Sequence, residues 1–252
     1  MDGHAVIVNA DDLGISDAVN EATFDLIARG RISSATIMAN GPSVHDAAKV
    51  ARHFSGCSFG VHLNLTQFEP LTGGVLARLL VDERGRMSRA NERASPSMQR
   101  LRAAYEEFCA QLERVAAFGI DVTHVDSHNH VHTIPALFPV LKEVQRRYGI
   151  RRVRLTKNMY GSDRPCTPAL IWKKRAYNWA LRWIYRTRTT DAFTEFLTYV
   201  NAGPVTRSSA GLVELMVHPG APSTGEEAAA LESDWIARAG FPLQMIPYTR
   251  LS

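Results

Sequence analysis

Short apolar runs with the composition of β-strands alternate with segments of helical spacing along nearly the whole chain. Alternation of this kind is typical of parallel strands that are joined by crossover helices. The sequence therefore predicts an α/β fold: a single-domain, (β/α) barrel-like fold related to the TIM barrel, with an incomplete or distorted barrel as the alternative to a regular one. The expected strands cover residues 5–9, 34–39, 59–65, 122–125, 152–155, 211–217 and 244–248. The expected helices lie between Ser16 and Gly30 and over residues 42–53, 98–118, 135–148 and 225–238.

The length and composition fit one globular domain over residues 1–252. Apolar residues make up 45% of the chain and charged residues 21%, which is enough to bury a substantial core. Residues 66–95 and 157–208 break the regular alternation. We expect both stretches to be insertions into the barrel, the first of them an active-site loop.

Cysteine usage and hydropathy predict a soluble, cytoplasmic protein. Cys57, Cys109 and Cys166 are an odd number at wide spacing, which argues against a disulfide framework and against a zinc site built on cysteine pairs. The first residues lack the basic and apolar regions of a signal peptide, and no run approaches the ~18 apolar residues of a membrane span.

Four polar clusters lie at the carboxyl ends of predicted strands. They are Asn-Ala-Asp-Asp at 9–12, His62, the run His-Val-Asp-Ser-His-Asn-His-Val-His at 124–132, and residues 214–220, which end in His-Pro-Gly. The carboxyl ends of barrel strands converge on the face that carries active sites. We therefore expect four separate elements to direct polar side chains to one place.

The residue types in these clusters favour a divalent metal site. A bound cation offsets the repulsion between Asp11 and Asp12, so one carboxylate can bind the ion while the other acts as a base. Two histidines from other strands would complete a two-histidine, one-carboxylate site with open positions for water and substrate. Alternatively, the aspartate pair is turn chemistry and His62 is a hydrogen-bonded core residue. Four histidines and an aspartate within residues 124–132 are harder to explain structurally.

The motifs at 9–14, 60–63, 123–132 and 218–220 resemble, in the same order, those of the YdjC-like carbohydrate deacetylases, the family of chitooligosaccharide deacetylase. The resemblance runs from about residue 5 to residue 250. Some members of the family are associated with hopanoid biosynthesis, and no motif of this chain decides whether it is one of them. It implies a barrel-like hydrolase that removes N-acetyl groups from amino sugars with one divalent metal ion, Mg²⁺ or Zn²⁺. It also implies an N-acetylated sugar or glycolipid as substrate, and a homodimer.

Carried over position by position, the resemblance assigns the metal to Asp12, His62 and His128. It makes Asp11 the candidate base that deprotonates the attacking water. His218 would protonate the departing amine, although its motif is equally consistent with a turn whose ring packs against the barrel.

Three further residues are candidates for orienting a ligand or contacting substrate: Asp126, His130 and Asn64. Strand alternation places His124 and Asp126 on the same side, so Asp126 is placed to orient a metal-binding imidazole. For His130 and His132, substrate contact and helix capping are left open.

Residues 168–188 form a basic, tryptophan-rich segment. Trp172, Trp179 and Trp183 recur at helical spacing, and residues 151–188 carry eleven Lys and Arg against a single acidic residue. The preferred interpretation is a helix that packs on the barrel or on a second subunit. The alternative is peripheral contact with membrane lipid. No nucleic-acid partner is expected, because the basic residues come without a recognisable binding fold.

Two other functions fit the same residues less well. A metal-dependent phosphoesterase, or Fe(II) oxygen chemistry, could use the two-histidine, one-carboxylate site. A non-catalytic sugar-binding protein could retain the pocket on the same scaffold, but loss of Asp11 or His62 would be expected there and both are present.

Overall fold

The computed structural model of the chain describes residues 4–161, 166–222 and 224–251. Its centre is a seven-stranded sheet with the order β4-β3-β2-β1-β6-β5, and β7 pairs with β1 beside this path. Every pair of neighbouring strands is parallel. The strands are β1 (His4–Leu13), β2 (Ser34–Ile37), β3 (Ser58–Leu63), β4 (Val125–Ser127), β5 (Ala192–Glu195), β6 (Val213–Val217) and β7 (Leu243–Met245).

The sheet curls into a half-barrel, and an irregular segment spans the gap between its edge strands β4 and β5. Val153 forms a parallel bridge with Val125, and Arg152 forms one with Arg188. Further along, the N–H of Asn158 donates to the carbonyl of Phe193, with N···O 3.3 Å. The predicted α/β, single-domain, barrel-like fold is confirmed.

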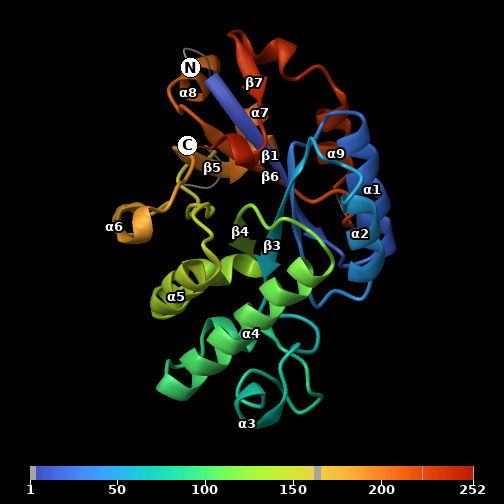
Figure 1. Cartoon of the computed structure of the whole chain (residues 1–252). Helices are drawn as coiled ribbons and strands as arrows, with labels where there is room; N and C mark the ends of the chain where they lie inside the picture. Colours follow the sequence, from blue (N-terminus) through green and yellow to red (C-terminus); the bar gives the residue numbers. More distant parts are fainter. Residues whose placement is uncertain (1–3, 162–165, 223, 252) are drawn as a thin grey trace.

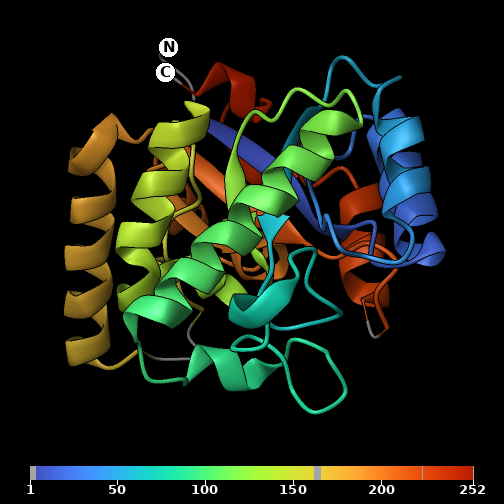
Figure 2. The ribbon, with the colours of Figure 1, turned by 60° about the horizontal axis from the view of Figure 1, so that its bottom comes forward.

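Helices cover the outside of the curled sheet (Figures 1 and 2). The Ser16 hydroxyl accepts a hydrogen bond from the N–H of Val19 at 3.3 Å, so the expected cap begins the first helix. The longer helices are α1 (Asp17–Ala28), α2 (Val44–Ala51), α4 (Met98–Ala117), α5 (Phe138–Tyr148), α6 (Pro168–Trp183) and α9 (Gly225–Glu232). The shorter ones are α3 (Gly74–Ala77), α7 (Phe196–Val200) and α8 (Pro204–Ser208).

The central strand is buried on both faces. Consecutive residues from Val6 to Ala10 in β1 have no exposed surface, which explains why the segment is nearly continuously apolar. Within the described residues, no helix is long and apolar enough to cross a membrane.

The structure differs from the sequence expectation in several elements. Residues 152–155 form isolated bridges instead of a continuous strand, and β5 lies within a stretch that we expected to be an insertion. The strand β4 begins three residues later than expected, at Val125. The last long helix ends at Glu232 instead of residue 238, because Ser233 takes an extended backbone.

Candidate metal centre

A β-bulge at the end of β1 positions the adjacent carboxylates Asp11 and Asp12. The three steps from Ala10 to Leu13 in β1 face only two steps in β2, and Asp12 takes a left-handed backbone with φ 65°. Consecutive side chains of a regular strand point to opposite faces, whereas here both carboxylates line the same cavity. The sequence placed this pair after the strand, but it lies within its last residues.

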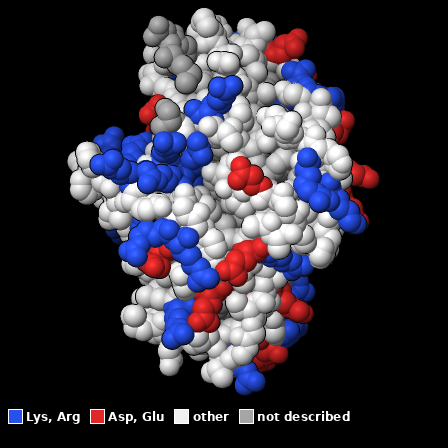
Figure 3. Space-filling view, in the orientation of Figure 1, with Lys and Arg blue, Asp and Glu red and all other residues white. Residues whose placement is uncertain are grey.

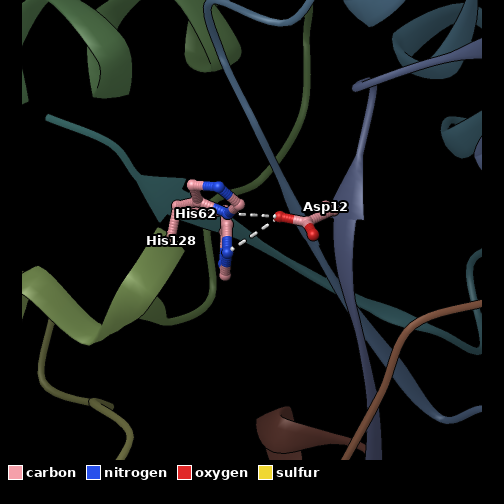
Figure 4. A group of neighbouring side chains, drawn as sticks. All are labelled: Asp12, His62 and His128. Carbon is pink, nitrogen blue, oxygen red and sulfur yellow. Dashed lines mark hydrogen bonds and ion pairs between the residues drawn. The ribbon is translucent and has the colours of Figure 1, made fainter. Parts of the chain in front are cut away.

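Asp12 faces two imidazoles that come from different elements (Figure 4). Its Oδ1 lies 3.2 Å from Nε2 of His62 in β3 and 2.8 Å from Nδ1 of His128, the first residue after β4. His62 is 2% exposed, while Asp12 and His128 are about 15% exposed, so the group is open to solvent on one side. The structure therefore brings together the three residues that the resemblance assigned to the metal.

The donor set of this group fits a divalent ion. One carboxylate oxygen and two imidazole nitrogens lie within 4.8 Å of one another. Burial would raise the pKa of Asp12, but the hydrogen bonds from His128 and His62 hold it well below its usual range, so the carboxylate is anionic. A second group of similar size, made of Asp11, His62 and Asp126, is fully buried. That group already has a cation, because Arg154 contacts both of its aspartates.

Asp126 holds the ring of His62 from behind. Its Oδ1 lies 2.7 Å from Nδ1 of His62, and its Oδ2 accepts a hydrogen bond at 3.0 Å from the hydroxyl of Thr36. The same hydroxyl is 3.1 Å from Nδ1 of His62. These contacts leave Nε2 of His62 directed at Asp12, which is the arrangement of a carboxylate that orients a metal-binding imidazole.

Arg154 is a central residue of the site that the sequence analysis missed. The side chain has no exposed surface, and its two terminal nitrogens each lie 2.6 Å from an oxygen of Asp11. It also contacts Asp126 at 2.8 Å and Glu214 at 2.7 Å. Burial would raise the pKa of Asp11, but the guanidinium outweighs it and holds that pKa well below the usual range. The local sequence contains one signal for this role: Arg154 is a charged residue next to Val153 within a predicted strand.

Asp11, Asp12 and His218 line one cavity of about 280 Å³. His218 follows β6, and its backbone N–H donates to Oε1 of Glu227 at 2.7 Å. The carbonyl of His218 accepts a hydrogen bond from the N–H of Ala221 at 3.3 Å, so the His-Pro-Gly motif forms a turn. The same turn places His218 at the cavity wall, so the two interpretations of the motif do not exclude each other.

Two histidines of the 124–132 run, His124 and His132, are buried and make structural contacts within the barrel. His124 stacks on Tyr248 with ring centroids 3.8 Å apart, and its Nε2 lies 3.1 Å from Oδ1 of Asn9. His132 contacts Oγ of Ser127 at 2.5 Å and the carbonyl of Arg154 at 3.2 Å. Burial lowers the pKa of both rings well below the usual value, so they are neutral at physiological pH.

His130 and Asn64, the other two candidates for contact with substrate, differ in their hydrogen bonding. Nδ1 of His130 has no hydrogen-bond partner within the described part of the chain, and burial lowers the pKa of this ring to about 4. The Asn64 side chain is fully buried: it donates to the carbonyl of Gln67 at 2.7 Å and accepts from the N–H of Thr66 at 2.8 Å. Asn64 therefore shapes the loop that follows β3, and its predicted contact with substrate stays a prediction.

The fold and the site together define a class: single-domain α/β barrels with a carboxylate and histidine cluster at the carboxyl ends of their strands. The chain belongs to the YdjC-like protein family, whose sequence profile matches residues 5–240.

Similar proteins include carbohydrate deacetylases. The one from Geobacillus stearothermophilus is 40% identical over 153 residues, which are 60% of this chain and 60% of that protein. A chitooligosaccharide deacetylase from Serratia marcescens is 35% identical over 147 residues, 58% of this chain and 57% of that protein. The matched region therefore spans less than two thirds of the length of these relatives.

Solved structures share the fold over nearly the whole chain. A protein from Enterococcus faecalis V583, named for cellobiose-phosphate cleavage, has a TM-score of 0.77 at 22% identity, covering 99% of both chains. The catalytic domain of a peptidoglycan N-acetylglucosamine deacetylase from Eubacterium rectale has a TM-score of 0.54 at 11% identity, covering 99% of this chain and 90% of the other.

Proposed function

We propose that this protein is a metal-dependent hydrolase that removes the N-acetyl group from an amino sugar. The observation that carries the proposal is the cluster of Asp12, His62 and His128 beside a cavity that Asp11 and His218 also line. The deacetylases among the similar proteins support the choice of reaction.

Asp12, His62 and His128 would hold the ion. When bound, a divalent ion supplies a Lewis acid that polarises the acetamide carbonyl and lowers the pKa of a water molecule. Two imidazoles in the donor set favour Zn²⁺ over Mg²⁺, because Mg²⁺ prefers oxygen ligands.

Asp11 would accept the proton of the attacking water. Its carboxylate is kept anionic by Arg154, and its orientation is fixed by that guanidinium and by the Asn9 amide, which donates to Oδ1 at 2.9 Å. The low pKa makes Asp11 a weak base. The fixed position of its carboxylate beside the attacking water would therefore contribute more to catalysis than its basicity.

His218 would donate a proton to the departing amine from another wall of the cavity. Ile15, Val19 and Pro219 give the same cavity an apolar side, which suits the methyl of an acetyl group.

The test is acetate release by the purified protein from N-acetylated mono- and oligosaccharides and glycolipids. The protein is first stripped with a chelator, and Zn²⁺, Mg²⁺, Mn²⁺ or Co²⁺ is then restored. We expect acetate only after metal is restored, and none from a His62→Ala variant. A matched control is His45→Ala, which changes a histidine that contacts Arg114 at the surface.

Two outcomes would replace the proposal. If the protein hydrolyses phosphoesters and releases no acetate, the proposed metal site would still stand, but the enzyme would be a phosphoesterase. Sugar binding with no turnover under any metal would assign a non-catalytic sugar-binding protein.

A further inference from the structure

The helix α6 exposes a stripe of tryptophans. Trp172, Trp179 and Trp183 lie on one side of the helix and are 68%, 63% and 70% exposed. Trp235, in contrast, is only 3% exposed. The sequence favoured a helix that packs on the barrel or on a second subunit. The helix does pack on the barrel, but not through the tryptophans, because within α6 only Asn178 and Leu181 are buried. Packing of the stripe on a second subunit stays a prediction. The helix α6 lies at the edge of the molecule (Figure 2), and its tryptophan side chains are exposed there.

The opposite side of α6 is firmly attached to the barrel. The Asn178 side chain accepts hydrogen bonds from the N–H and hydroxyl of Thr156 at 3.0 and 2.9 Å. The Tyr177 hydroxyl donates to the carbonyl of His132, and Lys142 donates to the carbonyl of Leu181 at 2.8 Å. The outward direction of the tryptophans is therefore fixed by contacts on the inner side.

Cations surround this stripe. Residues 166–188 contain six Lys and Arg and no acidic residue. The exposed ones include Lys173, Arg175 and Arg182, and the Arg175 guanidinium lies 5.8 Å from the ring centre of Trp172. Figure 3 shows Lys and Arg side chains gathered on the side of the molecule where α6 lies.

We propose that α6 docks this protein onto the surface of an anionic lipid bilayer. Tryptophan rings are favoured at the boundary between acyl chains and headgroups, where the ring is buried and its N–H stays hydrated. Lysine and arginine beside them attract anionic headgroups. A helix that is attached along one side and presents tryptophans and cations along the other has the chemistry of a peripheral membrane helix.

Charge disfavours a second copy of this chain as the occupant. A two-fold symmetric contact through α6 would place the cations around the stripe of one copy close to the same cations of the other copy. With no acidic residue between 166 and 188, the cations of the two copies would repel one another.

The experiment is co-sedimentation of the full chain with vesicles, either pure phosphatidylcholine or phosphatidylcholine with about one third phosphatidylglycerol. We expect binding to the phosphatidylglycerol vesicles, with a blue shift of tryptophan fluorescence, and release at high salt because screening weakens the attraction to headgroups. A Trp172→Ser/Trp179→Ser/Trp183→Ser variant should bind at least tenfold more weakly. A Lys173→Gln/Arg175→Gln/Arg182→Gln variant should lose the preference for phosphatidylglycerol.

The matched control changes three other exposed apolar residues. Val75, Met98 and Val205 are 79%, 81% and 81% exposed and lie outside α6, so a variant with serine at all three should bind vesicles like the wild type. Thermal melting checks that each variant folds. Acetate release from a water-soluble substrate should be equal in all of them, which separates this proposal from the proposed reaction.

Three results would overturn the inference. The first is a failure of the wild type to bind phosphatidylglycerol vesicles. The second is equal loss of binding in the control variant. The third is a wild-type dimer that becomes monomeric in the tryptophan variant and does not bind vesicles, which would assign the stripe to a subunit contact.

Discussion

At the scale of single residues, the charge balance around Arg154 governs the site. One buried guanidinium contacts the carboxylates of Asp11, Asp126 and Glu214. A single positive charge cannot offset three negative ones, so the carboxylate with the weakest compensation is the one expected to hold a proton. Burial raises the pKa of Glu214 to about 7 in spite of its contact with Arg154.

The raised pKa predicts that Glu214 makes stability depend on pH. A carboxyl whose pKa is higher in the folded than in the unfolded protein contributes stability below the unfolded value near 4.5, and that contribution is lost as the pH rises through about 7. Glu214→Gln removes the titration. The free energy of unfolding of this variant, measured with urea, should therefore improve relative to wild type between pH 5.5 and pH 8. A constant difference would contradict the assignment.

Replacing Asp11 and replacing Asp126 should have different effects, the first on turnover and the second on metal binding. Asp11→Asn should keep the metal and lose turnover, because Asp11 is not among the three proposed ligands. Asp126→Asn should weaken metal binding by about 10- to 100-fold, because it removes the carboxylate that orients His62. Metal titration and acetate release, measured on both variants, check this split. Retained turnover in Asp11→Asn would place the base elsewhere.

At the scale of elements, Gly220 sets the position of the turn that carries His218. Gly220 has φ 71°, and a Cβ at this position would lie 2.5 Å from the carbonyl oxygen of Ala18 in α1. Gly220→Ala should therefore combine the cost of a left-handed alanine, about 1–2 kcal/mol, with a backbone clash that shifts His218. Gly240→Ala is the matched control, because Gly240 has φ 82° but nothing within 4 Å of its Cβ position.

The two glycine variants are compared by urea unfolding and by acetate release. Gly220→Ala should be the less stable, and only that variant should lose activity. Equal losses of stability would mean that the contact with α1 has no effect on the turn.

The sequence predicted those elements whose signals are local. Alternation of strands and helices, the Ser16 cap and the polar residues at strand ends are visible over a few residues, and the structure contains them. Arg154 was missed because its partner Asp11 lies 143 residues away, and no short pattern encodes such a pairing. The strand β5 was missed because it lies in the irregular region after the basic segment. The spacing of the tryptophans predicted a stripe on a helix, but spacing alone does not indicate which side faces the barrel.

At the scale of the whole molecule, the candidate metal ligands connect segments that are far apart in the chain. Asp12 lies on β1, His62 on β3 and His128 after β4, so their donor atoms meet only when the barrel is folded. An ion that binds the folded state alone must stabilise it, by about 2.7 kcal/mol at a free concentration of 100 times its Kd.

That gain predicts a large thermal shift. For a chain of this size, 1 kcal/mol moves Tm by about 2–4 °C, so restoring Zn²⁺ to stripped protein should raise Tm by about 5–10 °C. Asp12→Ala should abolish the shift, because it removes the only carboxylate of the ligand set. Asp46→Ala is the control: Asp46 is an exposed aspartate that pairs with Lys49, and its loss should leave the shift intact. Calorimetry of the three proteins, wild type, Asp12→Ala and Asp46→Ala, with and without the ion measures this shift. An equal shift in Asp12→Ala would mean that the ion binds at other residues.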